Sequence, residues 1–275
     1  MRLIADSGST KTDWCMGDTH PMIHTRGINP FHQSAEDIRR TLAEELLPRL
    51  PKEWSPSHIH FYGAGCTPEK SVIVKEVLRT LFPQASVEVE SDLLGAARAL
   101  CRKEEGIACI LGTGSNSCLY DGEKIIANVS PLGYILGDEG SGATLGKRLV
   151  GDCLKRQLPE DICEAFLKET GLTPAEIIDK VYRRPQANRF LASLTPFLSA
   201  HREAKEIHRL LVSCFEDFFR RNVMQYHRTD LRVHFVGSIA RHFREEVEEA
   251  ATAFGLQTGK FIQSPIGELW NFHER

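Results

Sequence analysis

The stretch Leu3–Trp14, which reads LIADSGSTKTDW, places an acid, a glycine and a run of hydroxyl side chains between two short apolar segments. An Asp-Ser-Gly turn alone would satisfy a hairpin, because glycine tolerates positive φ and aspartate bonds its own backbone. The residues that follow, Ser9 to Thr12, go beyond that need. Their hydroxyl and ammonium groups suit anionic oxygens, and the Asp6 carboxylate suits Mg²⁺. The stretch therefore predicts a phosphate-binding turn near the start of the chain.

The composition is that of an ordinary folded protein and excludes some classes of function. The chain has 275 residues, of which 41% are hydrophobic and 26% charged, and its net charge is −3. Nucleic-acid binding needs clustered Lys and Arg, and no such stripe is present. No apolar run approaches the ~20 residues of a membrane span, and no signal peptide precedes Asp6. We expect a cytoplasmic protein that binds neither nucleic acid nor membrane.

Eight cysteines are spread along the chain without a Cys-x-x-Cys pair. A zinc site or an iron–sulfur cluster within one chain needs closely spaced ligands. We therefore expect reduced, mostly buried thiols.

Hydrophobic periodicity predicts an α/β protein made of two similar halves. Each half begins with a β-hairpin that carries Gly, Ser and Thr at its turn and then alternates helices and strands, which indicates a duplicated unit with a cleft between the copies. Ser34 and Asp37 form a capping box at the start of the first helix. The expected domains are residues 1–104 and residues 105–275, the second with a helical insertion. The expected strands cover residues 3–5, 14–16, 22–25, 58–62, 86–90, 107–111, 117–120, 125–129, 232–236 and 257–262, and the expected helices cover 34–48, 68–81, 92–102, 141–228 with interruptions, and 239–254.

The second hairpin turn, Leu111–Ser117, reads LGTGSNS and predicts a second phosphate-binding turn. It is not a dinucleotide fingerprint, because the residues after it are typical of a strand and not of the required helix. A later segment, residues 142–147, differs from a Walker A loop at two required positions and fits a closely packed helix start.

Three further positions stand out. Asp92 follows a predicted strand and fits either a plain helix N-cap or, at a strand end facing a cleft, a general base. The segment Leu136–Gly142, LGDEGSG, places two carboxylates among glycines that a simple turn would not need. The Gly237-Ser238 turn after a strand fits either a tight connection or a place for a base or ribose.

Taken in order, DSGSTKT, GTGSNS and VGSIA resemble the actin, hexokinase and Hsp70 ATPase superfamily. More narrowly, SDLLGA, GTGSNS and LGDEGSG resemble the BadF/BadG/BcrA/BcrD ATPase family, and within it the N-acetylglucosamine kinases. This resemblance implies two ribonuclease-H-like domains with ATP and Mg²⁺ in a central nucleotide cleft. It implies a Mg-ATP-dependent kinase of an amino sugar, with N-acetylglucosamine preferred and glucosamine or a muramic-type sugar as alternatives.

The resemblance also assigns roles to individual residues. Asp6 would hold Mg²⁺ and Asp92 would be the catalytic base. The ATP phosphates would lie against Gly8, Ser9, Thr10, Lys11, Gly112, Thr113, Gly114 and Ser115, the adenosine against Gly237 and Ser238, and the sugar against Asn29, Asn116, Gly133 and Asp138. This chain departs from the family at Gly133-Tyr134, where the kinases have Gly-Trp beside the sugar.

Two other functions remain compatible with the same motifs. One is an ATPase that activates a partner enzyme, as the dehydratase activators of the family do with a cluster shared across a dimer. The other is a sugar-sensing regulator, which the intact acids and turns disfavour. The kinase interpretation implies a small-molecule sugar as the partner and leaves a homodimer open.

Overall fold

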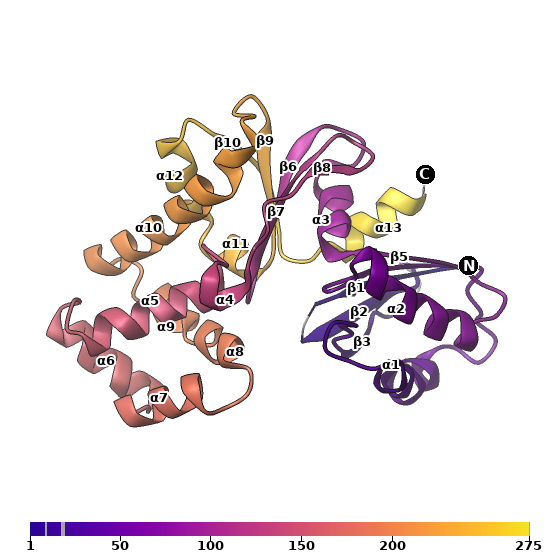
Figure 1. Cartoon of the computed structure of the whole chain (residues 1–275), viewed down its shortest axis with the longest axis horizontal. Coiled ribbons are helices and arrows are strands. Elements are labelled where there is room, and N and C mark those ends of the chain that lie inside the picture. Colours follow the sequence, from indigo (N-terminus) through magenta and orange to yellow (C-terminus); the bar gives the residue numbers. More distant parts are fainter. Residues whose placement is uncertain (9, 18–19, 275) are drawn as a thin grey trace. The chain divides into compact units, whose positions relative to one another are not determined.

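The computed structural model describes residues 1–8, 10–17 and 20–274, and the chain divides into two compact units. Unit 1 contains Met1–Glu104, the short segment Gly122–Ile125 and the segment from Ser264 onward; unit 2 contains Glu105–Asp121 and Ile126–Gln263. Each unit has its own five-stranded sheet and its own hydrophobic core (Figure 1).

The sheet of unit 1 has the order β3-β2-β1-β4-β5. The first three strands pair antiparallel, and β4 and β5 continue the sheet parallel to β1. Leu3, Ile4 and Ala5 of β1 are fully buried, so both faces of this central strand are covered, as is usual where parallel strands meet. The strands are β1 (Arg2–Ser7), β2 (Lys11–Cys15), β3 (Ile23–Arg26), β4 (His58–Gly63) and β5 (Ser86–Ser91).

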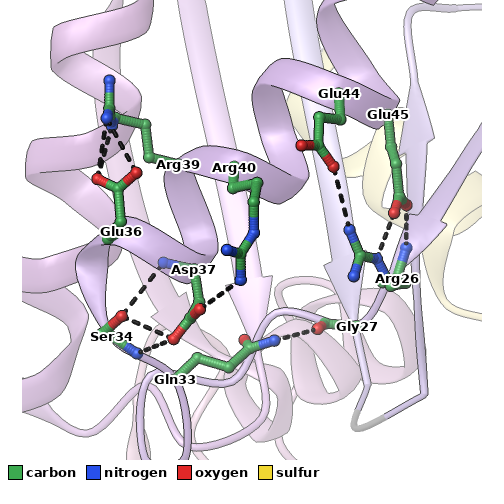
Figure 2. A network of polar contacts seen from close by, with 10 residues as sticks. All are labelled: Arg26, Gly27, Gln33, Ser34, Glu36, Asp37, Arg39, Arg40, Glu44 and Glu45. Atoms are coloured by element: carbon green, nitrogen blue, oxygen red, sulfur yellow. Dashed lines mark hydrogen bonds and ion pairs between the residues drawn. The ribbon is translucent and has the colours of Figure 1, made fainter.

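The helices of unit 1 begin where the sequence indicates. Ser34 accepts a hydrogen bond from the Asp37 N–H and the Asp37 carboxylate accepts one from the Ser34 N–H, which confirms the predicted capping box (Figure 2). Ser91 caps the third helix by accepting a bond from the Leu94 N–H. The helices are α1 (Ala35–Thr41), followed by the π-helical turn η1 (Leu42–Leu46) and the 3₁₀ turn η2 (Leu47–Arg49), then α2 (Pro68–Leu81), α3 (Asp92–Cys101) and α13 (Ile266–Glu274).

The last helix, α13, belongs to unit 1, so assigning all of residues 105–275 to the second domain was wrong for this segment. Its Leu269 is fully buried, and the Glu268 carboxylate forms an ion pair with Arg102 at the end of α3. Trp270 packs so closely on Gly17 that a Cβ there would lie 2.8 Å from the indole ring. These contacts join residues far apart in the chain, which no local pattern could indicate.

The sheet of unit 2 has the order β10-β9-β6-β7-β8, which repeats the plan of unit 1. Its central strand, β6, again pairs antiparallel with the next strand on one side and parallel with β9 on the other. The predicted duplication of one α/β unit, and with it the ribonuclease-H-like, actin-like fold, is confirmed. The strands are β6 (Gly106–Leu111), β7 (Ser115–Tyr120), β8 (Ile125–Ala127), β9 (Arg232–Val236) and β10 (Gln257–Ile262).

A long run of helices stands between β8 and β9 (Figure 1). Helix α10 contributes Phe215, Phe218 and Phe219 to the core and packs on α12. The predicted single helix over 239–254 is divided at Phe243, whose ring is buried in the core. The helices are α4 (Gly133–Leu136), α5 (Gly142–Leu154), α6 (Glu160–Thr170), α7 (Pro174–Tyr182), α8 (Ala187–Ala192), α9 (Thr195–Ala200), α10 (Lys205–Arg221), the 3₁₀ turn η3 (Val223–Tyr226), α11 (Ser238–His242) and α12 (Arg244–Ala253).

The predicted close packing of the segment at 142–147 is confirmed. A Cβ on Gly146 would lie 1.9 Å from the Leu191 carbonyl oxygen, so only glycine lets α5 approach α8 this closely. Within the described part of the chain, no helix combines the length and apolar character that a bilayer crossing requires.

Candidate active site

Unit 1 gathers two acids at the carboxyl ends of its parallel strands. Ser7 of β1 lies in register with Gly63 of β4, which in turn lies in register with Ser91 of β5. Asp6 precedes Ser7 and Asp92 follows Ser91, so both acids lie at this edge of the sheet, where α/β proteins bind their ligands. Because Ser91 caps α3, the interpretation of Asp92 as a plain N-cap is wrong.

The two acids have unusual proton affinities. The pKa of Asp6 is raised to about 7, chiefly by burial and then by the neighbouring carboxylates of Asp92 and Asp13, whereas the Lys11 ammonium opposes this rise. Burial also raises the pKa of Asp92 to about 6, although hydrogen bonds to its carboxylate from the backbone, among them that from the Leu93 N–H, oppose this rise. Acids with raised pKa values that repel one another are typical of catalytic and metal-binding sites.

Sequence reasoning missed Asp13, the cross-strand neighbour of Asp6. Its side chain is only 5% exposed, and its two oxygens meet the Lys11 Nζ at 2.8 Å and the His24 Nδ1 at 2.7 Å. Alternation within β2 could have indicated that positions 11 and 13 share a face of the strand. Asp13 thus fixes the lysine of the predicted phosphate turn.

The first turn itself is partly described. The Gly8 N–H donates to the Lys11 carbonyl at 3.0 Å, and the Thr10 carbonyl accepts from the Gly27 N–H at 3.0 Å. A Cβ on Gly8 would contact nothing closer than 3.9 Å, which leaves space beside this backbone. The predicted phosphate residue Ser9 lies outside the described residues.

Asn29 lies in a loop that Ser7 ties to the same edge of the sheet. The Ser7 hydroxyl donates to the Ile28 carbonyl and accepts from the Ile28 N–H, each at 2.9 Å. The Gln33 amide closes the loop. It accepts from the Asn29 N–H at 2.7 Å. It also donates to the Gly27 carbonyl at 3.1 Å (Figure 2). Asn29 therefore lies in unit 1 with Asp6 and Asp92, and its role as a sugar contact stays a prediction.

The same loop requires a glycine at position 65. A Cβ there would lie 2.1 Å from the Asn29 Oδ1, and Gly65 has a φ of +74°. Glycine at this position allows the Asn29 side chain to lie directly against the backbone that follows β4.

The predicted phosphate turn of unit 2 connects β6 to β7. The Gly112 and Thr113 carbonyls accept from the Gly142 and Ala143 N–H groups at 2.8 and 3.1 Å, which fixes the turn on the start of α5. A Cβ on Gly112 would contact nothing within 4 Å, so the turn borders open space. The geometry leaves room for a ligand at this backbone.

Asp138 lies against this turn. Its Oδ1 accepts from the Ser115 N–H at 3.3 Å, and a Cβ on Gly114 would lie 3.0 Å from its Oδ2. Burial raises the pKa of Asp138, and the Glu139 carboxylate adds to this, whereas the Ser115 N–H and Lys147 lower it. Asp138 has a φ of +53°, which is uncommon for a residue other than glycine. The structure thus brings together a predicted sugar residue and the predicted phosphate residues Gly114 and Ser115.

Two other predicted sugar residues lie in the same unit. Asn116 is the second residue of β7 and is half-buried. Gly133 begins α4 with a φ of +74°, and a Cβ there would meet nothing within 4 Å. Three large apolar side chains around it, Leu132, Ile135 and Leu136, are more than 60% exposed.

The predicted adenosine residues begin α11. The Gly237 N–H donates to the Ile262 carbonyl at 3.0 Å, and a Cβ on this residue would lie 2.2 Å from the Leu111 carbonyl oxygen. Its φ of +123° also requires glycine. Gly237 therefore has a packing role beside the second phosphate turn, and the exposed Ser238 follows it.

The comparison with solved structures identifies the family. A proposed N-acetylglucosamine kinase from Porphyromonas gingivalis is 51% identical to this chain, with a TM-score of 0.96; the match covers 99% of this chain and 98% of that protein. This chain belongs to the N-acetylglucosamine kinase-like group of the BadF/BadG/BcrA/BcrD ATPase family. The resemblance inferred from the motifs is thereby confirmed, although no family model matches the sequence.

Two curated relatives of this group carry amino-sugar kinase names. The N-acetylmuramic acid/N-acetylglucosamine kinase of Clostridium acetobutylicum is 32% identical over 174 residues, which are 58% of this chain and 56% of that kinase. The glucosamine kinase GspK of Vibrio cholerae is 31% identical over 117 residues, which are 42% of this chain and 39% of that kinase. This chain thus spans about half or less of the length of each curated relative that it matches.

Proposed function

We propose that this protein is a Mg-ATP-dependent kinase that phosphorylates a hydroxyl group of an amino sugar, with N-acetylglucosamine as the preferred substrate. The observation that carries the proposal is the position of Asp92 at the carboxyl end of β5, beside Asp6 and with its capping role taken over by Ser91. The names of the relatives support the choice of an amino sugar.

Asp92 would act as the general base. Its Oδ1 is held by the Leu93 N–H, and its Oδ2 would take the proton of the sugar hydroxyl that attacks the γ-phosphorus of ATP. A pKa of about 6 suits this task, because a base works best when its pKa lies just below the working pH. Asn29, tied to the same strand edge, would orient the sugar.

The residues of unit 1 also fit Mg²⁺. Mg²⁺ in proteins is usually bound through one or two carboxylates, with phosphate and water oxygens completing the coordination. Asp6, whose charge is opposed by two neighbouring carboxylates, provides an oxygen that a divalent cation would stabilise. When bound, the ion would neutralise negative charge on the ATP phosphates. The Lys11 ammonium, held by Asp13, would also neutralise negative charge on the ATP phosphates.

In unit 2 the turn from Gly112 to Ser115 would receive phosphate oxygens through its backbone, in the space that the missing Cβ of Gly112 leaves. Asp138 and Asn116 would contact sugar hydroxyls, and Gly133 would border the sugar. Gly237 and Ser238 would border the adenosine. A cytoplasmic location and a homodimer stay predictions from the sequence.

The test is ADP release from Mg-ATP with a panel of sugars. The panel contains N-acetylglucosamine, glucosamine, N-acetylmannosamine, N-acetylmuramic acid and glucose, with a control that lacks sugar. We expect strong stimulation by N-acetylglucosamine and its loss in Asp92→Asn. ATP hydrolysis that no sugar stimulates would contradict the proposal and favour the partner-activating ATPase.

A further inference from the structure

Two asparagine side chains in unit 2 form a pair whose hydrogen bonds define how each amide is oriented. The Asn116 Oδ1 accepts from the Ser117 N–H at 2.9 Å and from the Asn128 Nδ2 at 2.9 Å. The same Asn128 Nδ2 also donates to the Ser117 carbonyl at 2.7 Å and to the Val129 carbonyl at 3.1 Å. Asn128 follows β8, so the pair joins the strand that carries the predicted sugar residue to the next segment of the chain.

The chemistry of these partners leaves one orientation for each amide. Oxygen and nitrogen of an asparagine amide are hard to tell apart by shape, and their assignment depends on the partners. A backbone N–H only donates, so the Asn116 atom that meets the Ser117 N–H must be oxygen. Backbone carbonyls only accept, so the Asn128 atom that meets Ser117 and Val129 must be nitrogen. Both assignments are consistent with the contact between the two side chains, in which the Asn128 Nδ2 donates to the Asn116 Oδ1.

Tyr226 contacts both of the segments to which Asn128 is hydrogen-bonded. The Tyr226 hydroxyl lies 2.7 Å from the Ser117 Oγ and accepts from the Val129 N–H at 3.2 Å. Both backbone segments that Asn128 bonds are therefore held independently of Asn128. The Asn116 Oδ1 is fully used by its two donors, and among residues 1–8, 10–17 and 20–274 no partner is recorded for its Nδ2.

We infer that Asn128 is a positioning residue for the sugar site: it holds the Asn116 amide so that Asn116 offers a ligand only N–H donors. The ligand group at this point is then a hydrogen-bond acceptor, such as a hydroxyl or acetamide carbonyl oxygen, and an ammonium group is disfavoured. The assignment of the ligand as a sugar rests on the proposed function.

Two isosteric substitutions separate the parts of this inference. Asn116→Asp keeps an inward oxygen for both donors and replaces only the outward NH₂ by an oxygen. Asn128→Asp places an oxygen opposite three acceptors, which removes the bond to Asn116. Asn128→Ala removes the contact without adding charge. Gln157→Ala is the matched control, because Gln157 is an exposed amide in the same unit whose Nε2 donates to the nearby Lys155 carbonyl.

The experiment measures steady-state ADP formation with the sugar that stimulates the wild type most, and thermal melting of each variant. Loss of one well-placed hydrogen bond changes binding by about tenfold. We expect the KM for the sugar to rise about tenfold in Asn116→Asp, Asn128→Asp and Asn128→Ala, with the KM for Mg-ATP within twofold of wild type and the melting temperature within about 3 °C. A sugar KM within twofold of wild type in both Asn128 variants, or an equal rise in the KM for Mg-ATP, would overturn the inference.

Side-chain amide NMR tests the pair without relying on activity. The Asn116 and Asn128 NH₂ signals are assigned by their loss in the two Asp variants. We expect the Asn116 NH₂ signals to shift when N-acetylglucosamine is added and to broaden in Asn128→Ala. Unchanged Asn116 signals in Asn128→Ala would show that Asn128 does not hold this amide. Absence of sugar-stimulated ADP formation by the wild type would instead reject the proposed function.

Discussion

Asp13 and Lys11 form an ion pair along β2 in which the carboxylate is 5% exposed and the lysine side chain 64% exposed, with Nζ and Oδ2 2.8 Å apart. The buried acid is the fixed partner, and His24 holds its other oxygen. An exposed lysine on its own samples many rotamers, so the pair restricts where its charge can lie.

We expect Asp13→Asn to weaken Mg-ATP binding through Lys11. The KM for Mg-ATP should rise about fivefold, since one charge-assisted hydrogen bond is worth about 1–2 kcal/mol at most in a partly exposed pair. Lys11→Met should raise it at least as much, and the double variant should be no worse than Lys11→Met alone. Steady-state kinetics of the four proteins measure this coupling. Additive effects would show that Asp13 acts independently of Lys11.

Asp92→Asn should remove the general base while leaving sugar binding in place. We expect kcat to fall about 10²- to 10⁴-fold, the usual contribution of a positioned base. Calorimetric titration should show a sugar Kd within about threefold of wild type. Glu53→Gln, an exposed acid of the same unit, serves as the control. Full activity in Asp92→Asn would exclude Asp92 as the base.

The same assignment predicts an acid limb in the pH profile of the wild type. A base must be unprotonated to accept a proton, and the pKa of Asp92 is about 6. We therefore expect kcat/KM to be constant above pH 7 and to decline about tenfold per pH unit below pH 6. A profile that stays flat down to pH 4.5, close to the ordinary pKa of an aspartate, would contradict the raised pKa.

Gly112, in the turn between β6 and β7, and Gly237, which packs against the Leu111 carbonyl just before that turn, should respond differently to alanine. A Cβ on Gly112 enters open space, whereas a Cβ on Gly237 would lie 2.2 Å from the Leu111 carbonyl oxygen at a φ of +123°. We expect Gly112→Ala to melt within about 2 °C of wild type and to raise the KM for Mg-ATP. Gly237→Ala should lower the free energy of unfolding by about 2–4 kcal/mol. Thermal melting combined with kinetics separates the two effects. A normal KM in Gly112→Ala would place the phosphates elsewhere.

The end of α13 should release from unit 1 in acid. The His273 ring stacks on His60 with centroids 3.7 Å apart, and its Nε2 lies 2.7 Å from the Tyr62 hydroxyl. The pKa of His273 is lowered to about 3, chiefly by burial and then by the nearby His60, Arg98 and Arg2. Because this pKa is depressed in the folded state, the stability it contributes is present above pH 6.5 and is lost as the pH falls toward 3.

Hydrogen exchange of the 266–274 peptide at pH 7.5 and pH 5, corrected for the intrinsic rate, measures this release. We expect protection to decline by about tenfold in the wild type at pH 5, and not in His273→Phe, which keeps a ring on His60 but cannot be protonated. His208→Gln, an exposed histidine of α10, is the control. Equal acid sensitivity in His273→Phe would assign the effect to another group.

Much of this organisation follows from local patterns. Alternating apolar residues and hairpin turns predicted both halves, and the capping box at Ser34 located the start of α1 to the residue. The position of Asp92 at a strand end also followed from the pattern, because parallel strands place their carboxyl ends along one edge. Local composition is sufficient for features of this kind.

Features that join distant residues were not predictable. Asp13 reads as an ordinary strand residue until β2 is paired with β3 and His24 reaches it. The pair of Asn116 and Asn128 depends on two segments twelve residues apart. Helix α13 belongs to unit 1, although it follows the last segment of unit 2 in the sequence. Such contacts depend on tertiary packing, which leaves no periodic pattern in a single sequence.

The return of α13 to unit 1 has a consequence for synthesis on the ribosome. The sheet of unit 1 is complete by residue 91, but the surface formed by Gly17, Tyr62, Arg98 and Arg102 waits for Trp270, His273 and Glu268. All of unit 2 is therefore synthesised before the last segment of unit 1, from Ser264 onward, leaves the ribosome. The half that is made first is the half that is completed last, and its partly folded form must stay soluble while some 160 further residues emerge from the exit tunnel.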